Sequence, residues 1–192
     1  MKSPASKRIV LASNSPRRRQ LLKEIVDDFD IAESREIEET YPENLPAEKV
    51  PAYLSRLKAE AFSDLIGSDN ILMTADTVVI LNGKILGKPH NEEEAVRMLL
   101  SLSGREHIVI TGVTLKSSEK TDTFSCRTSV HFDEISEDEI RQYVAEFKPF
   151  DKAGSYGIQE WIGCRGISAI NGCFYNVMGL PVSMIYNHLQ SF

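Results

Sequence analysis

A single stretch, ILMTADTVVIL at residues 71–81, constrains the fold more than any other part of the sequence. It is nearly all apolar and rich in β-branched residues, a pattern typical of a buried strand. The Asn82-Gly83 pair that follows is a strong hairpin signal and predicts a return strand in KIL, residues 84–86. The sequence therefore predicts a sheet built around this strand.

One carboxylate, Asp76, interrupts this apolar run. An unpaired charge in such surroundings costs several kcal/mol. We therefore expect Asp76 to meet a metal ion, a lysine or water in a cleft. The alternative is a structural aspartate that bonds to the backbone of a neighbouring turn.

Helix and strand signals continue along the chain. Strands are expected at residues 8–12, 29–32, 71–81, 84–86, 105–116 and 121–132. Helices are expected at about 16–26, at 92–102 after Asn91, and after the capping box of Ser136 and Glu139. A further helix should begin near Pro51, bury Leu54, Leu57, Ala61 and Leu65, and end at Gly67. The last part should hold strands on both sides of the Asn171-Gly172 turn and a helix after Pro181.

These elements follow one another without an internal repeat, a low-complexity tract or a long linker. We expect residues 1–192 to form one α/β domain. In it, a mixed central sheet is flanked by helices, and a cleft separates two lobes.

The composition is that of an ordinary globular protein, with 192 residues, 42% of them hydrophobic, and a formal net charge of -6. The negative charge disfavours binding to nucleic acid and to anionic membranes. No apolar run reaches the roughly 18 residues of a membrane span, and IVLA after Arg8 is too short for a secretory signal. We therefore expect a cytoplasmic protein with no membrane partner.

The sequence shows no metal-ligand spacing. Cys126, Cys164 and Cys173 are odd in number and lack a CxxC pair, so free buried thiols are expected in place of a disulfide or zinc site. The four histidines lack HxxxH or HExxH spacing and are expected at surface or core positions.

Three arginines crowd the start of a predicted helix in SNSPRRRQLL, residues 13–22. Ser15 is a good N-cap and Pro16 suits the first helical position, but the positive helix end disfavours arginine. Free backbone N–H groups, serine hydroxyls and planar guanidinium groups would all suit phosphate. We expect a polyanion between Arg17 and Arg18, with Arg19 facing elsewhere, since helical residues project about 100° apart. The alternative is three solvated arginines.

Two lysines and one further carboxylate support a polyanion site. They are Lys58 in LSRLKAEA, Lys88 in GKP, and Glu39 in the acidic run EIEET. Taken alone, each is most often a solvated charge. Together they would neutralise phosphates and add a second carboxylate to Asp76.

Seven segments carry a resemblance to a known family in their order and spacing. They are LASNSPRRRQLL, EETYPE, LSRLKAEAF, TADTVVILNGKILGKP, LSGREHIVITGV, FDKAGSYGIQ and INGCFYNVMGLP. The chain resembles the Maf family of nucleoside triphosphate pyrophosphatases over nearly its whole length. The resemblance implies an elongated α/β fold related to the inosine triphosphatase-like enzymes, a homodimer, and a divalent cation such as Mg²⁺ or Mn²⁺. It also implies hydrolysis of nucleoside triphosphates between the α and β phosphates.

The resemblance assigns roles to individual residues. Ser13, Arg17 and Arg18 match the phosphate-binding turn, Glu39, Lys58 and Lys88 match cleft residues, and Asp76 matches the residue regarded as the catalytic proton acceptor. Glu39 and Asp76 are the expected metal ligands, and Thr77 matches a specificity position. Gln159 in AGSYGIQ matches the branch similar to dTTP/UTP pyrophosphatases, as opposed to the branch that acts on 7-methyl-GTP.

The chain departs from the family pattern directly after Gln159, where EWIG replaces a small, glycine-rich segment. Trp161 in this segment either packs against the protein or covers the base, and Tyr156 either packs or stacks on the base. A second candidate substrate is therefore a modified purine nucleotide. A candidate from another class is a non-enzymatic regulator that binds nucleic acid or a division protein through the arginines, but it would leave Asp76 and Lys88 unexplained.

Overall fold

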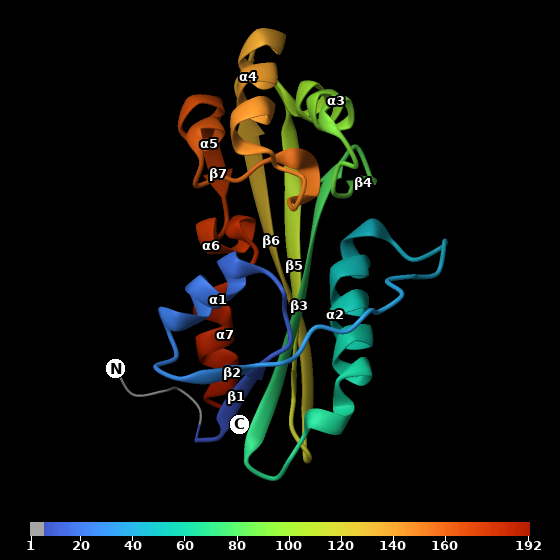
Figure 1. Ribbon diagram of the computed structural model, residues 1–192, viewed down its shortest axis with the longest axis vertical. Coiled ribbons are helices and arrows are strands. Elements are labelled where there is room, and N and C mark those ends of the chain that lie inside the picture. Colours follow the sequence, from blue (N-terminus) through green and yellow to red (C-terminus); the bar gives the residue numbers. More distant parts are fainter. Residues whose placement is uncertain (1–5) are drawn as a thin grey trace. The chain divides into compact units, whose positions relative to one another are not determined.

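The computed structural model describes residues 6–192. In this part of the chain, seven strands form one sheet in the order β2-β1-β3-β5-β6-β7, with β4 paired to β3. The strands are β1 (Arg8–Leu11), β2 (Phe29–Ile31), β3 (Asn70–Leu81), β4 (Lys84–Leu86), β5 (Glu106–Lys116), β6 (Thr121–Phe132) and β7 (Ile167–Asn171). β1 is parallel to β2 and β3, whereas β4 is antiparallel to β3 and β7 to β6. The predicted mixed sheet is confirmed (Figure 1).

Helices flank the sheet, as predicted. They are α1 (Pro16–Lys23), α2 (Val50–Ala61), α3 (Glu92–Leu102), α4 (Glu137–Phe147), α5 (Trp161–Gly166), α6 (Phe174–Met178) and α7 (Val182–Leu189), with short 3₁₀ turns η1 (Ala47–Lys49), η2 (Ser63–Leu65) and η3 (Ala153–Ser155). The predicted caps are present: the Asn91 side chain accepts from the Glu94 N–H, and Ser136 and Glu139 form a capping box. No described helix combines the length and apolar character needed to cross a bilayer.

The chain divides into two compact units. Unit 1 contains the chain up to Asp76 together with Thr111–Cys126 and Gly179–Phe192, and unit 2 contains Thr77–Ile110 and Arg127–Met178. The divisions therefore fall within the long strands β3, β5 and β6, and in β3 between Asp76 and Thr77.

The core of unit 1 follows from the alternation of side chains along its strands. Leu72 of β3 packs with Ala59 and Phe62 on the side of α2. Its neighbours Ile71 and Met73 are fully buried and point to the opposite face of the sheet. Figure 1 shows α1 and α7 on that side of the strands and α2 on the other. Both faces of β3 are thus covered, which explains its continuous apolar run.

The core of unit 2 lies between its strands and the helices α3 and α4. Phe132 of β6, Leu99 of α3 and Tyr143 of α4 are buried in one hydrophobic cluster. Apolar positions three and four apart on each helix supply this buried face. The two helices lie next to each other in Figure 1.

The predicted buried face of α2 is wrong in part. Leu54 is buried, but Leu57 is half-buried. Because the helix ends at Ala61, Ala61 is exposed and Leu65 beyond it is half-buried. Ser55 is fully buried instead. Its hydroxyl lies 2.9 Å from Thr114 Oγ1, and this bond allows a polar side chain inside the core.

The predicted strand after the Asn171-Gly172 turn is also wrong, because α6 follows there. The buried Asn176 side chain donates from Nδ2 to the Val109 carbonyl at 3.1 Å and to Thr128 Oγ1 at 2.9 Å. These bonds hold this turn of helix against β5 and β6.

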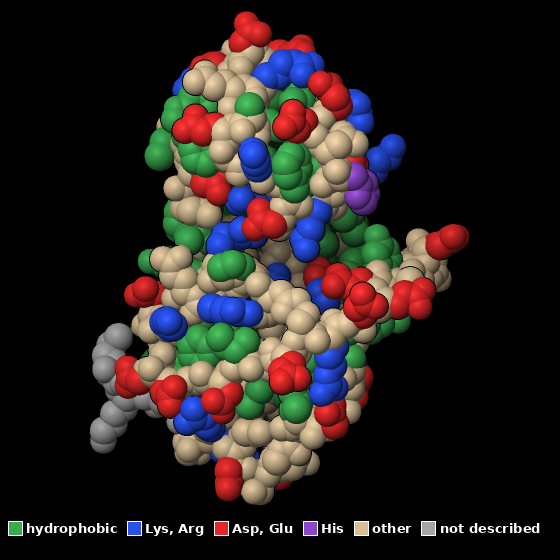
Figure 2. Space-filling view, viewed as in Figure 1, with side chains coloured by type: hydrophobic (Ala, Val, Ile, Leu, Met, Phe, Trp, Pro, Cys, Tyr) green, Lys and Arg blue, Asp and Glu red, His purple; other side chains and the backbone are tan. Residues whose placement is uncertain are grey.

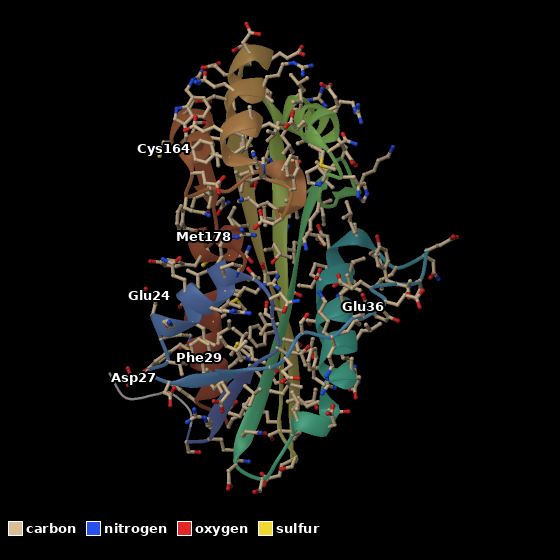
Figure 3. The ribbon with its side chains drawn as sticks, in the orientation of Figure 1. Glu24, Asp27, Phe29, Glu36, Cys164 and Met178 are labelled. Carbon is tan, nitrogen blue, oxygen red and sulfur yellow. The ribbon has the colours of Figure 1, made fainter. Side chains whose placement is uncertain are left out.

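The three cysteines are free, as predicted, but only Cys126 is buried. Cys164 is exposed and points outward from α5 (Figure 3).

Candidate active site

The turn between β1 and α1 has the predicted geometry of an N-terminal cap. Ser15 is extended, and its side chain accepts from the backbone N–H of Arg18, with Pro16 at the first helical position. No acidic side chain occupies the first turn of α1. The N–H groups of this turn therefore form a positive end beside a cluster of arginines.

Arg18 is an anchor within unit 1. Its Nε donates to the Gly179 carbonyl at 3.0 Å, and its Nη1 donates to the Ala75 carbonyl at 2.8 Å and to Ser13 Oγ at 3.4 Å. Burial lowers the pKa of its guanidinium, and the nearby Asp76 carboxylate opposes this shift. Arg18 thus fixes Ser13 against the strand that carries Asp76.

Arg19 also reaches this turn, and whether it faces away from the polyanion stays a prediction. Arg19 is half-buried, and its Nη2 donates to the Ser13 carbonyl at 3.4 Å. The long side chain reaches back over the turn, so the direction of its Cα–Cβ bond does not decide where the guanidinium lies.

The charge of Arg17 is close enough to lower the pKa of the Arg18 guanidinium further.

Asp76 meets a lysine, which is one of the three partners that the sequence allowed. Lys58 Nζ, from α2, lies 2.6 Å from Asp76 Oδ1 and 3.0 Å from Glu39 Oε1. The side chains of Lys58 and Asp76 are only 14% and 12% exposed, whereas Glu39 is 51% exposed. Because the inner pair is largely desolvated, removing either partner would leave a costly unpaired charge.

Glu39 belongs to an acidic segment between β2 and η1 that runs beside α2. Arg35 holds the segment through two bonds to Asp64, at 2.6 and 2.7 Å, and one to the Ala61 carbonyl at 2.7 Å. Glu36 lies on this segment in Figure 3, and Figure 2 shows acidic side chains gathered over it. This anchoring places Glu39 within reach of Lys58.

The two carboxylates suit a divalent cation that also binds phosphate. Oxygen atoms of Glu39 and Asp76 converge on one point, the Lys58 ammonium nitrogen. Mg²⁺ is commonly bound by one or two carboxylates, with water and substrate phosphates as the other ligands. Among the described residues, no group of three or more His, Cys, Asp or Glu side chains could hold a metal ion. Glu39 and Asp76 could supply two carboxylate ligands to such a cation.

The other predicted site residues, Thr77, Lys88 and Gln159, belong to unit 2. Lys88 is exposed just beyond β4, and Gln159 is exposed in the loop before α5. These two segments are neighbours within the unit, because the Gly154 N–H donates to the Gly87 carbonyl at 3.0 Å.

The loop that carries Gln159 is tightly folded. Gly154 and Ser155 both have positive φ, 69° and 65°, and a Cβ at Gly154 would lie 2.9 Å from a Val79 methyl group. Tyr156 is buried, and its hydroxyl lies 2.7 Å from His107 Nε2. Of the two roles considered for Tyr156, packing is therefore the one that the structure supports.

Three residues of unit 2 that the sequence did not single out support this loop: His107, Lys152 and Glu160. Lys152 Nζ lies 3.1 Å from Glu160 Oε1. Trp161, at the start of α5, is 40% exposed and stacks on Tyr143 at a ring distance of 6.5 Å. The only sequence signal for these residues was the segment EWIG, which differs from the family pattern. That segment did not indicate that Glu160 forms an ion pair with Lys152.

The fold and these residues define a mixed α/β protein in which an arginine-rich helix N-terminus lies near two carboxylates joined by Lys58. The family model described as Maf-like protein matches residues 8–192. A protein of Porphyromonas gingivalis called dTTP/UTP pyrophosphatase is 51% identical over 187 residues, covering 96% of this chain and 94% of that protein. A protein of Bacteroides thetaiotaomicron with the same name is 47% identical over 182 residues, covering 95% and 94%. The chain belongs to the Maf family.

The solved structure of the Staphylococcus aureus Ham1 protein superposes on 66% of this chain and 72% of the Ham1 chain. The sequence identity is 19% and the TM-score is 0.49.

Proposed function

We propose that this protein hydrolyses dTTP and UTP between the α and β phosphates, releasing the nucleoside monophosphate and pyrophosphate. The observation that carries the proposal is the buried Asp76–Lys58 pair, next to Ala75, whose carbonyl Arg18 holds. The two relatives called dTTP/UTP pyrophosphatase support the substrate class.

The reaction needs neutralisation of the leaving pyrophosphate and a water molecule in line with the α-phosphorus. Arg17, Arg18 and Lys58, with Ser13 and the N–H groups of α1, would bind phosphate oxygens, and Lys88 would add a fourth cation. Asp76 would accept the proton of the water as its oxygen bonds to phosphorus. The bond from the α-phosphorus to the bridging oxygen then breaks, and pyrophosphate keeps that electron pair.

Glu39 and Asp76 would hold a divalent cation, Mg²⁺ or Mn²⁺, with the substrate. When bound, such a cation supplies further neutralisation of phosphate charge. The convergence of the two carboxylates on Lys58 supports this assignment. Lys58 would then exchange a carboxylate for a phosphate partner as the nucleotide arrives.

Gln159 and Thr77 would select the base. A carboxamide offers both a donor and an acceptor, which suits the N3–H and carbonyl edge of uracil or thymine. The exposure of Gln159, directly after the buried residues 154–158, supports a role in binding.

We further propose that the protein acts in the cytoplasm as a homodimer. Its proposed substrates occur there, and the family resemblance supports the dimer. Light scattering coupled to size-exclusion chromatography would give the mass, which should be twice 21.5 kDa.

The direct test is product analysis with UTP, dTTP, CTP, ATP, GTP and 7-methyl-GTP under one metal condition. UMP and pyrophosphate in equal amounts, with UTP and dTTP as the best substrates, are expected. Release of orthophosphate alone, or preference for 7-methyl-GTP, would contradict the proposal. Binding to DNA without any nucleotide hydrolysis would instead support the regulator.

A further inference from the structure

We infer that Glu160 is a positioning residue for nucleotide selection, acting with Lys152 and Tyr143 to fix the loop that presents Gln159. The selectivity part of this inference rests on the proposed function, whereas the ordering of the loop does not. The inference explains the EWIG departure, because the glutamate of that segment takes the central place in the arrangement.

A single carboxylate closes the loop at both ends. Glu160 Oε1 lies 3.1 Å from Lys152 Nζ, so the residues before and after the loop are joined by an ion pair. Glu160 Oε2 accepts a hydrogen bond from the Tyr143 hydroxyl of α4. The same hydroxyl accepts from the Gly157 N–H at 3.2 Å, in the middle of the loop. Glu160 therefore connects both loop ends and the loop centre to a core helix.

Burial makes these contacts sensitive to loss. The side chains of Lys152 and Glu160 are 10% and 17% exposed, and Tyr143 is fully buried. Burial, together with the hydrogen bond to Glu160, raises the pKa of Tyr143, so its hydroxyl remains a donor. Lys152 also contacts the exposed Asp151 at 2.9 Å, which compensates only partly for a lost Glu160.

The backbone of the loop is shaped to receive this carboxylate. A Cβ at Gly157 would lie 2.7 Å from Glu160 Cδ, so any larger residue would displace the glutamate. The Glu160 N–H also donates to the Gly157 carbonyl at 3.0 Å, which closes a turn around Gln159. Gln159 is thus exposed on a turn whose ends, Gly157 and Glu160, are fixed by hydrogen bonds and an ion pair. A binding residue needs such a fixed position to discriminate between ligands.

The test compares Glu160→Gln, Lys152→Met and the double variant with wild type. Glu160→Gln keeps the shape and can still accept from Tyr143, but it removes the charge that Lys152 needs. We expect hydrogen exchange of the segment 156–160 to become at least about fivefold faster and the UTP/CTP ratio of kcat/KM to fall by a similar factor, as loss of one charge-assisted bond predicts. In the double variant, the fold-loss of UTP/CTP selectivity should be smaller than the product of the fold-losses in the two single variants. The reason is that the double variant leaves no buried charge without its partner.

Glu93→Gln is the matched control, since Glu93 forms an exposed ion pair with Arg141 in the same unit, at 3.0 Å. It should change neither readout. Faster unfolding or a lower Tm in Glu160→Gln, with unchanged UTP/CTP selectivity and unchanged exchange at 156–160, would overturn the inference. A wild-type protein without pyrophosphatase activity would contradict the proposed function, and hydrogen exchange would still decide whether Glu160 orders the loop.

Discussion

Lys58 Nζ lies 2.6 Å from Asp76 Oδ1, with both side chains largely buried. The lysine therefore neutralises the carboxylate. A triphosphate carries enough negative charge to compete for the ammonium group. Arrival of such a substrate would then break the ion pair between Lys58 and Asp76.

Asp76→Asn should abolish most activity while keeping the fold, and loss of the ion pair with Lys58 should lower Tm. The amide keeps the size of the side chain but cannot accept the proton, and general-base catalysis typically contributes about 10²–10⁴-fold. The measurement is kcat with UTP at saturating metal, alongside circular dichroism. Asp69→Asn, at an exposed aspartate just before β3, is the control. Near wild-type turnover in Asp76→Asn would remove the catalytic assignment.

Alanine variants of the three arginines of α1 should differ in whether they lose kcat/KM, Tm or both. Arg17→Ala should lower kcat/KM by a factor that corresponds to about 1.5–3 kcal/mol, the range for hydrogen bonds to charged groups. Arg18→Ala should lower both kcat/KM and Tm, because it also removes the bonds to the Ala75 and Gly179 carbonyls. Arg19→Ala should have a smaller effect on kcat/KM than either.

Lys23→Ala, at the exposed end of the same helix, is the control for these variants. Equal, small losses of kcat/KM at all three arginines would favour solvated charges over phosphate ligands.

Gln159→Leu should alter the nucleotide profile far more than the stability. Leucine has similar bulk but lacks the donor and acceptor that would pair with uracil. The kcat/KM values for UTP and dTTP should fall towards that for CTP, and Tm should stay close to wild type because the side chain is exposed. Gln142→Leu, on the exposed face of α4, controls for the added apolar surface. An unchanged profile would show that the loop does not read the base.

His107 should make stability pH-dependent. Burial lowers the pKa of His107 to about 4, whereas an unfolded histidine titrates near about 6.5. Between these values the unfolded chain binds a proton that the folded protein does not, so stability rises with pH in this window. Acidification from about pH 6.5 to 4 should therefore remove up to about 3 kcal/mol.

The variant His107→Gln tests this origin, because glutamine can still bond to the Tyr156 hydroxyl but does not titrate. Denaturant unfolding at pH 7 and 4.5 should show a smaller loss in the variant than in wild type. Equal losses would assign the acid sensitivity to other groups.

Gly112→Ala should destabilise unit 1. A Cβ at this position would lie 2.3 Å from backbone atoms of Pro51 and Ala52, which cannot yield as a flexible side chain would. Overpacking of this kind costs about 1–3 kcal/mol. Gly67→Ala is the control, since its Cβ would meet only Asn70 Nδ2 at 3.8 Å. Thermal unfolding of both variants makes the comparison, and equal Tm values would contradict the close approach.

The sequence predicted most elements because local signals and burial agree in them. The apolar run of β3, the Asn82-Gly83 turn and the caps at Asn91 and Ser136 all act within a few residues. The predictions fail where contacts with residues distant in the sequence determine burial or secondary structure. Ser55 is buried because Thr114 bonds to it, and Asn176 turns a predicted strand into α6 because β5 and β6 supply its acceptors.

The same distinction applies to the candidate site. The need of Asp76 for a partner followed from its apolar neighbours, but the choice of Lys58 depends on how α2 packs against β3. The reach of Arg19 back to Ser13 depends on side-chain torsions that no spacing rule specifies. Whether the predicted site residues act together on one nucleotide stays a prediction.

Because the divisions between the units lie within β3, β5 and β6 and before Gly179, the chain passes between the units four times. Neither unit is a continuous piece of the gene, so no single truncation isolates one from the other. Isolating unit 2 would require replacement of residues 111–126 by a short turn as well as removal of both ends. Deleting either unit would therefore cut β3, β5 and β6, so the phosphate turn and the Gln159 loop cannot be studied apart by simple truncation.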